Sequence, residues 1–112
     1  MPRPNDTLSN FELMVLLAVL RLGEEAYGVP IAEAIERHRG KAVAMGSVYA
    51  ALDRLGSKAF VVSELGEATP ERGGKAKRYF RVTAKGLAEV AETRRALTEL
   101  WARLPALQGK QA

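Results

Sequence analysis

The sequence has no cysteine and a single histidine among its 112 residues. Disulfides and thiolate metal sites are therefore excluded, and too few histidines remain for a zinc or iron cluster. There is no glycine-rich phosphate motif ahead of a helix in a βαβ context. The neighbouring acids Glu24 and Glu25 fall in a predicted turn, with no apolar pocket to raise the pKa of either carboxyl. We predict no metal, no cofactor and no catalytic residue, so an enzyme is the least favoured function.

Long apolar runs are also missing. The longest, Leu13–Leu20, is far shorter than the roughly 20 residues that a membrane-spanning helix requires. Residues 1–7 are polar, contain two prolines and lack the apolar region of a secretory signal. We expect a cytoplasmic protein whose residues 1–7 form a flexible N-terminal lead.

Acidic residues are absent from one basic stretch, residues 72–85, although the net charge of the chain is only +4. This stretch carries Arg72, Lys75, Lys77 and Arg78 around the pair Gly73-Gly74, and the glycines supply the positive φ values of a hairpin connection. Apolar strands flank it, over 60–65 and 79–83, and we expect them to alternate between core and solvent. The pattern predicts a two-stranded β wing with a basic tip, suited to phosphates or a minor groove.

The segment before the wing has the spacing of an amphipathic helix. Val48, Ala51, Leu52 and Leu55 follow an i, i+3, i+4, i+7 pattern, which places them on one packed face. Nearer the other face lie Ser47, Tyr49, Ala50, Asp53 and Arg54. We interpret this segment as a recognition helix whose first-turn amides and Ser47 can donate to a phosphate.

Two further helices precede it. The first is predicted to begin with a capping box formed by Ser9 and Glu12 and to end at Gly23, and it is apolar on most of its circumference. Such a helix is either shared with another subunit or wrapped by its own chain. The second opens near Pro30, ends at Gly40, and supports the recognition helix.

A last helix is expected over residues 84–104, capped by Thr83 and terminated by Pro105. Apolar residues recur on it at heptad spacing: Leu87, Val90, Leu97, Trp101 and Leu104. Two heptads are too few for an isolated coiled coil, so this helix needs other surfaces as well. Residues 8–83 would thus form a winged helix domain, residues 84–104 a dimerisation helix and residues 105–112 a flexible tail, in a mainly α (α+β) fold.

Four segments, in this order and spacing, resemble PadR-type winged-helix transcriptional regulators of the short subfamily with one C-terminal dimerisation helix. They are FELMVLLAVL at 11–20, AYG at 26–28, GSVYAALDRL at 46–55 and RGGKAKRYFRVTAKG at 72–86, and the resemblance covers about 8–104. Family members usually carry Glu and then Lys-Gly where this chain has Gly56-Ser57-Lys58-Ala59. The exit of the recognition helix is therefore expected to be looser or differently angled.

The resemblance implies a homodimer that binds an inverted repeat in double-stranded DNA, usually as a repressor released by a small ligand or another signal. It assigns DNA contacts to Ser47 and Tyr49 of the recognition helix and to Arg72, Lys75 and Lys77 of the wing. Dimerisation through the first and last helices would involve Phe11, Met14 and the heptad positions Leu87, Val90, Leu97, Trp101 and Leu104. Trp101 would either fill the dimer core or stack on a flat aromatic effector.

Other interpretations stay open for several residues. The wing cations also fit an ordinary solvated hairpin tip, and Tyr49 also fits a half-buried residue that packs on the second helix. Arg54 and Lys58 would meet the DNA backbone or balance Asp53 and Glu64. The main hypothesis is a sequence-specific DNA-binding regulator, and the alternative is a winged-helix protein-interaction module without specific DNA binding.

Overall fold

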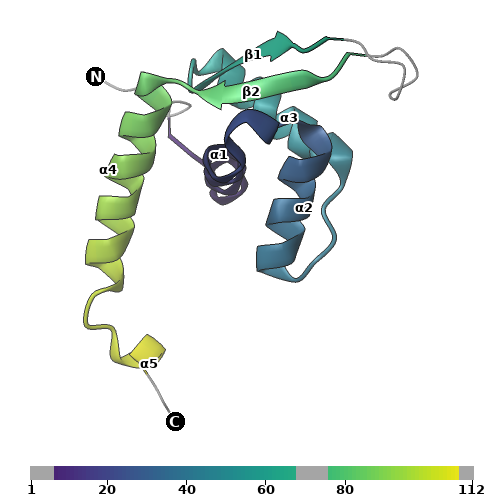
Figure 1. Ribbon diagram of the computed structural model, residues 1–112. Coiled ribbons are helices and arrows are strands. Elements are labelled where there is room, and N and C mark those ends of the chain that lie inside the picture. The colour runs from purple at the N-terminus through teal and green to yellow at the C-terminus, as the bar shows by residue number, and fades with distance from the viewer. Residues whose placement is uncertain (1–6, 68–75, 109–112) are drawn as a thin grey trace.

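The computed structural model describes residues 7–67 and 76–108 and shows a winged helix-turn-helix fold. Figure 1 shows a two-stranded hairpin lying across three helices, and a fourth helix running away from them. The elements in chain order are α1 (Asn10–Leu22), a 3-10 turn η2 (Gly23–Glu25), α2 (Gly28–Arg39), α3 (Met45–Ser57), β1 (Val61–Leu65), β2 (Arg78–Val82), α4 (Ala84–Trp101) and α5 (Pro105–Gln108). Within the described ranges, no helix is long and apolar enough to cross a membrane.

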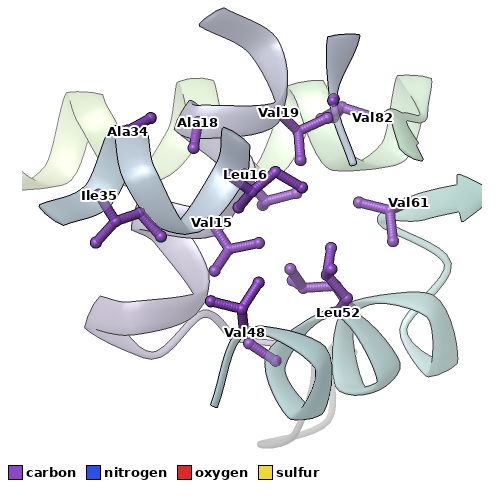
Figure 2. Close-up of a cluster of buried hydrophobic side chains, with 14 of the residues drawn as sticks. Val15, Leu16, Ala18, Val19, Ala34, Ile35, Val48, Leu52, Val61 and Val82 are labelled. Atoms are coloured by element: carbon purple, nitrogen blue, oxygen red, sulfur yellow. The ribbon is translucent and has the colours of Figure 1, made fainter. Parts of the chain in front are cut away.

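The core lies where α1, α2 and α3 meet the base of the hairpin (Figure 2). The predicted inner face of α3 is confirmed, since its apolar positions are buried together with Ile31, Ala34 and Ile35 of α2. Those positions are Val48, Ala51, Leu52 and Leu55. Apolar burial of this kind is the main force that holds such a small domain together.

Helix α1 has more apolar surface than its own chain covers. One stripe, which includes Val15, Leu16 and Val19, is fully buried, whereas Leu17 and Leu20 stay exposed on the other side. Its predicted start is confirmed, because the Ser9 hydroxyl accepts from the Glu12 amide at 3.1 Å and the Glu12 carboxylate accepts from the Ser9 amide at 3.0 Å. The surplus apolar face is thus a property of a well-defined helix.

The end of α3 is a closed Schellman motif built on an alanine. The Phe60 amide donates to the Leu55 carbonyl at 2.9 Å, and the Ala59 amide donates to the Gly56 carbonyl at 3.0 Å. Ala59 therefore adopts a left-handed conformation with φ of 64°. Both capping hydrogen bonds form, so the helix exit is not loose, although an L-alanine is strained there.

Replacing Ala59 with glycine is expected to stabilise the fold. Glycine adopts this φ without the Cβ penalty of about 1–2 kcal/mol, and the greater freedom of glycine in the unfolded chain offsets about half of that. We expect a net gain of about 0.5–1 kcal/mol. Urea unfolding of Ala59→Gly beside the wild type measures this gain, and an unchanged or lower midpoint contradicts it.

The wing is a regular antiparallel pair that is buried only at its base. Val61 pairs with Val82 and Leu65 with Arg78. The predicted alternation between core and solvent is wrong for β1, where Val62, Ser63 and Leu65 are all exposed. It holds in β2 only next to the core, where Phe80 is half-buried, Arg81 exposed and Val82 buried. The hairpin extends beyond the helices, so only the end next to the core has a surface to pack on.

Helix α4 leaves the body after its second turn, in which Val90 still packs against the core. Its predicted cap is confirmed, since the Thr83 hydroxyl accepts from the Gly86 amide, yet Gly86 is the only buried residue of this helix. The helix ends at Trp101, three residues before the predicted end. Arg103 has φ of 58°, and Leu104 precedes a proline, which disfavours the helical conformation.

Residues 105–108, predicted to belong to a flexible tail, form the short helix α5. The protruding α4 gives the chain a radius of gyration of 16.3 Å. A compact domain of this length would have about 13 Å.

Candidate nucleic-acid interface

The outward side of α3 is mostly polar, and the N-terminus of this helix has no side-chain cap. Ser47, Ala50 and Asp53 are exposed, and the N-cap residue Ala44 makes no side-chain hydrogen bond to the first turn. The first turn also lacks an acidic residue. An uncapped helix start presents free N–H groups and the positive end of the helix dipole. This end of α3 therefore favours an anion.

Tyr49 is both exposed and packed on α2. Its side chain remains 47% exposed, but a Cβ added at Gly28 would lie 2.3 Å from the Tyr49 hydroxyl oxygen. Gly28 thus leaves the space that the ring occupies at the start of α2. Of the two interpretations left open for Tyr49, the packing on the second helix is present, but the residue is exposed rather than half-buried. The exposed remainder of the ring lies beside the wing.

Aromatic contacts tie the wing to the junction before α2. The Lys77 ammonium lies 3.9 Å from the centroid of the Tyr27 ring, within the range of a cation–π interaction. The Tyr27 and Tyr79 rings meet edge to face at 5.4 Å. In addition, the Phe80 amide donates to the Ala26 carbonyl at 2.8 Å. The position of Lys77 is therefore set by this aromatic support.

The other predicted wing cations have different outcomes. Arg78 is exposed and donates to the Ser63 hydroxyl at 3.0 Å across the hairpin. Arg72 and Lys75 lie outside the described residues. Arg81 forms an ion pair with Glu64 at 3.7 Å, but both side chains are exposed to solvent, so the pair contributes little to stability.

Arg54 and Lys58 pair with a residue that the sequence did not suggest as their partner. The Glu12 carboxylate accepts from Arg54 Nε at 2.7 Å and from Lys58 Nζ at 2.8 Å, so neither cation balances Asp53 or Glu64. The Glu12 side chain is only 3% exposed. Glu12 shares the stripe of α1 that carries the buried residues Val15, Leu16 and Val19, which was the available signal for its burial.

The environment of Glu12 shifts its pKa strongly. Burial would raise the pKa of this carboxyl, but hydrogen bonds from Lys58, the Ser9 amide and Arg54 outweigh burial and lower the pKa from 4.5 to about 2. The ionised carboxylate therefore links the start of α1 to the outer end of α3.

Replacing Glu12 with glutamine is expected to destabilise the fold at pH 7 much more than at pH 3. The folded pKa lies below the unfolded value, so the stabilisation is complete above about pH 5 and is lost as the pH falls toward 2. The shift corresponds to about 3 kcal/mol. Urea unfolding of both proteins at the two pH values measures the difference, and an equal loss at both contradicts an ionic origin.

A groove on the α1 side of α3 gathers further basic groups. Its walls come from the start of α1, the loop between α2 and α3, and α3 itself, and its volume is about 560 Å³. The polar side chains lining it are Asn10, Arg39, Lys41, Ser47 and Arg54. Arg39 and Lys41 could not be assigned a role from the sequence, because their proximity to Ser47 depends on how the loop between α2 and α3 folds.

Basic residues border α3 on the wing side too. Tyr49 lines a second groove together with Lys77 and Arg78, and Arg78 also lines a third with Asp53 and Ser57. The recognition helix is therefore flanked by cations on both sides, Arg39 and Lys41 on one and Lys77 and Arg78 on the other. This is the arrangement that a helix in a major groove requires, because a phosphate backbone borders each side of that groove.

The predicted dimer residues on α4 and just after it form an apolar surface, whereas Phe11 and Met14 of α1 line the groove beside Arg39 and Arg54. Leu87, Trp101 and Leu104 are exposed, with Trp101 at 59%. Phe11, Met14, Val90 and Leu97 are half-buried. On the opposite side of α4, Arg95 forms ion pairs with Glu92 and Glu99. The helix is thus amphipathic, and its apolar side is largely uncovered within one chain.

Comparisons with known proteins identify the family and the fold of this chain. The model of the transcriptional regulator PadR-like family matches residues 16–92. A search of curated proteins finds no match.

Three solved structures with this fold are PadR-type regulators. A PadR-like transcriptional regulator from Bacillus cereus has a TM-score of 0.71 at 24% identity, with 89% of this chain and 93% of that chain covered. A PadR-like transcription factor from Bacteroides fragilis has a TM-score of 0.66 at 27% identity, covering 80% and 82%. A PadR family regulator from Eggerthella lenta has a TM-score of 0.63 at 28% identity, covering 78% and 73%.

Proposed function

Because this chain belongs to the PadR-like family of transcriptional regulators, we propose that it is a dimeric, sequence-specific DNA-binding repressor of an inverted-repeat operator. The observation that carries the proposal is the placement of cations on both sides of the exposed face of α3. That face would enter the major groove, and the flanking cations would meet the two phosphate backbones.

The proposed contacts divide into two sets. On α3, Ser47 and the free amides near it bind a phosphate or a base edge, Tyr49 contacts the backbone beside the wing, and Arg54 binds a phosphate from the α1 side. In the wing, Lys77 and Arg78 bind phosphates, and the remaining cations that we propose there are Arg72 and Lys75. Asp53 is the only acidic residue on the outer face of α3, so the helix carries little charge that opposes DNA.

The proposed dimer uses the apolar surface left uncovered on α1 and α4. Two copies would bury Leu87, Val90, Leu97, Trp101 and Leu104, whereas Phe11 and Met14, which were predicted to join them, line the groove beside Arg54. Burial of exposed apolar area of this kind drives stable association. Trp101 would fill the dimer core, or it would form one wall of a site for a small aromatic effector that releases the DNA.

Selection from a random duplex library tests this function. The protein should enrich duplexes that contain an inverted repeat whose half-sites lie about one helical turn apart, because a two-fold dimer places its recognition helices in successive major grooves. Enrichment of no common sequence, together with stable capture of a defined protein partner, would instead favour the interaction module.

Removing two wing cations is expected to weaken DNA binding in a salt-dependent way. Each phosphate contact contributes about 0.9 to the slope of log affinity against log salt, so Arg72→Ala with Lys75→Ala should flatten the slope by about 2 per subunit. Affinity at low salt should fall on both the enriched and a scrambled duplex. The matched control is Lys85→Ala with Arg95→Ala, two cations of α4, and an equal loss in the control contradicts a wing contact.

A further inference from the structure

We infer that Glu12 is a positioning residue for DNA binding, whose buried carboxylate holds the Arg54 guanidinium in the orientation that reaches a DNA phosphate. The inference rests on the proposed function and goes one step beyond it. Glu12 is shielded from solvent and therefore from DNA, so its part in DNA recognition is indirect and acts through Arg54.

The geometry leaves Arg54 free to bind a second anion. Glu12 Oε2 accepts from Nε of Arg54 at 2.7 Å, and a guanidinium has four further N–H donors on its two terminal nitrogens. Within residues 7–67 and 76–108, the structure gives these donors no acceptor. The Arg54 side chain is 51% exposed. One edge of the guanidinium is therefore fixed by the protein while the rest faces solvent.

The carboxylate itself is fixed. Its other oxygen, Oε1, accepts from Lys58 Nζ at 2.8 Å and from the Ser9 amide at 3.0 Å. Lys58 is held in turn, since its ammonium also donates to the Thr7 carbonyl at 2.8 Å. Glu12 cannot rotate without breaking several of these bonds, so it acts as a rigid support for Arg54.

Arg54 lies in a groove where the proposed function places a DNA phosphate. It lines the groove shared with Arg39, Lys41 and Ser47, on the side of α3 away from the wing. An arginine bound on one edge loses less conformational freedom when it binds a phosphate, which is how a supporting layer of residues increases the precision of a binding site. Lys58 lacks this exposure and does not share the role.

If only net charge mattered, removing Glu12 would strengthen DNA binding, whereas a positioning role predicts that it weakens specific binding. Loss of a negative charge near the interface should strengthen binding to any DNA, because the protein becomes more basic. Loss of a positioning carboxylate should weaken binding to the specific duplex, where the phosphate must be met in one geometry. The two contributions can therefore be separated by comparing specific with nonspecific DNA.

The test is a double-mutant cycle of Glu12→Gln and Arg54→Ala, measured as dissociation constants for the enriched and the scrambled duplex. Glutamine keeps the acceptor for the Ser9 amide, so the capping box is retained, and circular dichroism confirms that each variant is folded. Either single change should weaken binding to the enriched duplex about tenfold. Glu12→Gln should leave binding to the scrambled duplex unchanged or stronger, and the double variant should be no weaker than Arg54→Ala.

Additive effects in the cycle, or an equal loss on both duplexes for Glu12→Gln, overturn the inference.

Arg54→Lys is a second test that leaves Glu12 in place. Lysine keeps the charge but not the forked geometry, so it should lose as much specific affinity as alanine, and full retention of affinity overturns the inference. If the wild type itself does not prefer the enriched duplex, the proposed function has failed, whereas an additive cycle in a protein that does prefer it refutes the positioning role alone.

Discussion

Gly86→Ala is expected to lower the free energy of unfolding by about 3 kcal/mol or more. A Cβ at this position would lie 2.3 Å from the carbonyl oxygen of Phe60 and 2.8 Å from Cγ1 of Val82. The Phe60 carbonyl cannot move freely, because it accepts from the Thr83 amide at 3.0 Å. Relief of the clash must therefore displace α4 from the base of the wing, at the point where α4 makes its one fully buried contact with the domain.

Urea unfolding measures this effect, and Gly56→Ala is the matched control. Gly56 is a helical glycine with no atom within 4 Å of an added Cβ. Alanine there should stabilise the helix by up to about 1 kcal/mol. Similar unfolding midpoints for wild type and Gly86→Ala would show that the junction between wing and α4 is not closely packed.

Leu97→Glu is expected to convert the proposed dimer to monomer and to reduce affinity for the enriched duplex at least a hundredfold. A charge placed in the apolar stripe of α4 would have to be buried against the second copy, which costs several kcal/mol without a partner charge. A monomer would contact one half-site only and would lose most of the advantage of the specific site. Sedimentation velocity gives the oligomeric state, and a binding titration gives the affinity.

Ala88→Glu is the matched control for this change. Position 88 lies on the side of α4 that carries Arg95 and its ion pairs with Glu92 and Glu99, away from the apolar stripe. The control adds the same charge and should leave both mass and affinity unchanged. A dimer that persists in Leu97→Glu would exclude this face of α4 from the interface.

Most of the fold follows from local sequence signals. The capping box at Ser9 and Glu12, the caps at Gly40 and Thr83, and the spacing of Val48, Ala51, Leu52 and Leu55 each depend on residues within one or two turns. Patterns of this length are visible in the sequence because the interactions that they produce are local.

The features that were missed depend on contacts between distant segments. Glu12 meets Arg54 and Lys58 across more than 40 residues, so its stripe position indicated burial but could not identify its partners. Arg39 and Lys41 reach the recognition helix only because of the path of the loop between α2 and α3. The wing strands were expected to alternate, but burial there depends on how far the hairpin extends beyond the helices.

The predicted site residues are partly brought together. Tyr49, Lys77 and Arg78 lie together on the wing side of α3, whereas Ser47 and Arg54 line the groove on the α1 side, where Glu12 holds Arg54. Helical periodicity could place Tyr49 on the outer face, but not the space at Gly28 that receives its ring. That space exists only because the start of α2 lies against α3.

The ratio of dissociation constants for scrambled and enriched duplexes of equal length, at physiological salt, tests the central claim most directly. A dimeric regulator that inserts α3 into successive major grooves should prefer the enriched duplex by roughly a thousandfold or more. Equal dissociation constants for the two duplexes would contradict it, because they would show that the cations around α3 provide only nonspecific attraction to DNA.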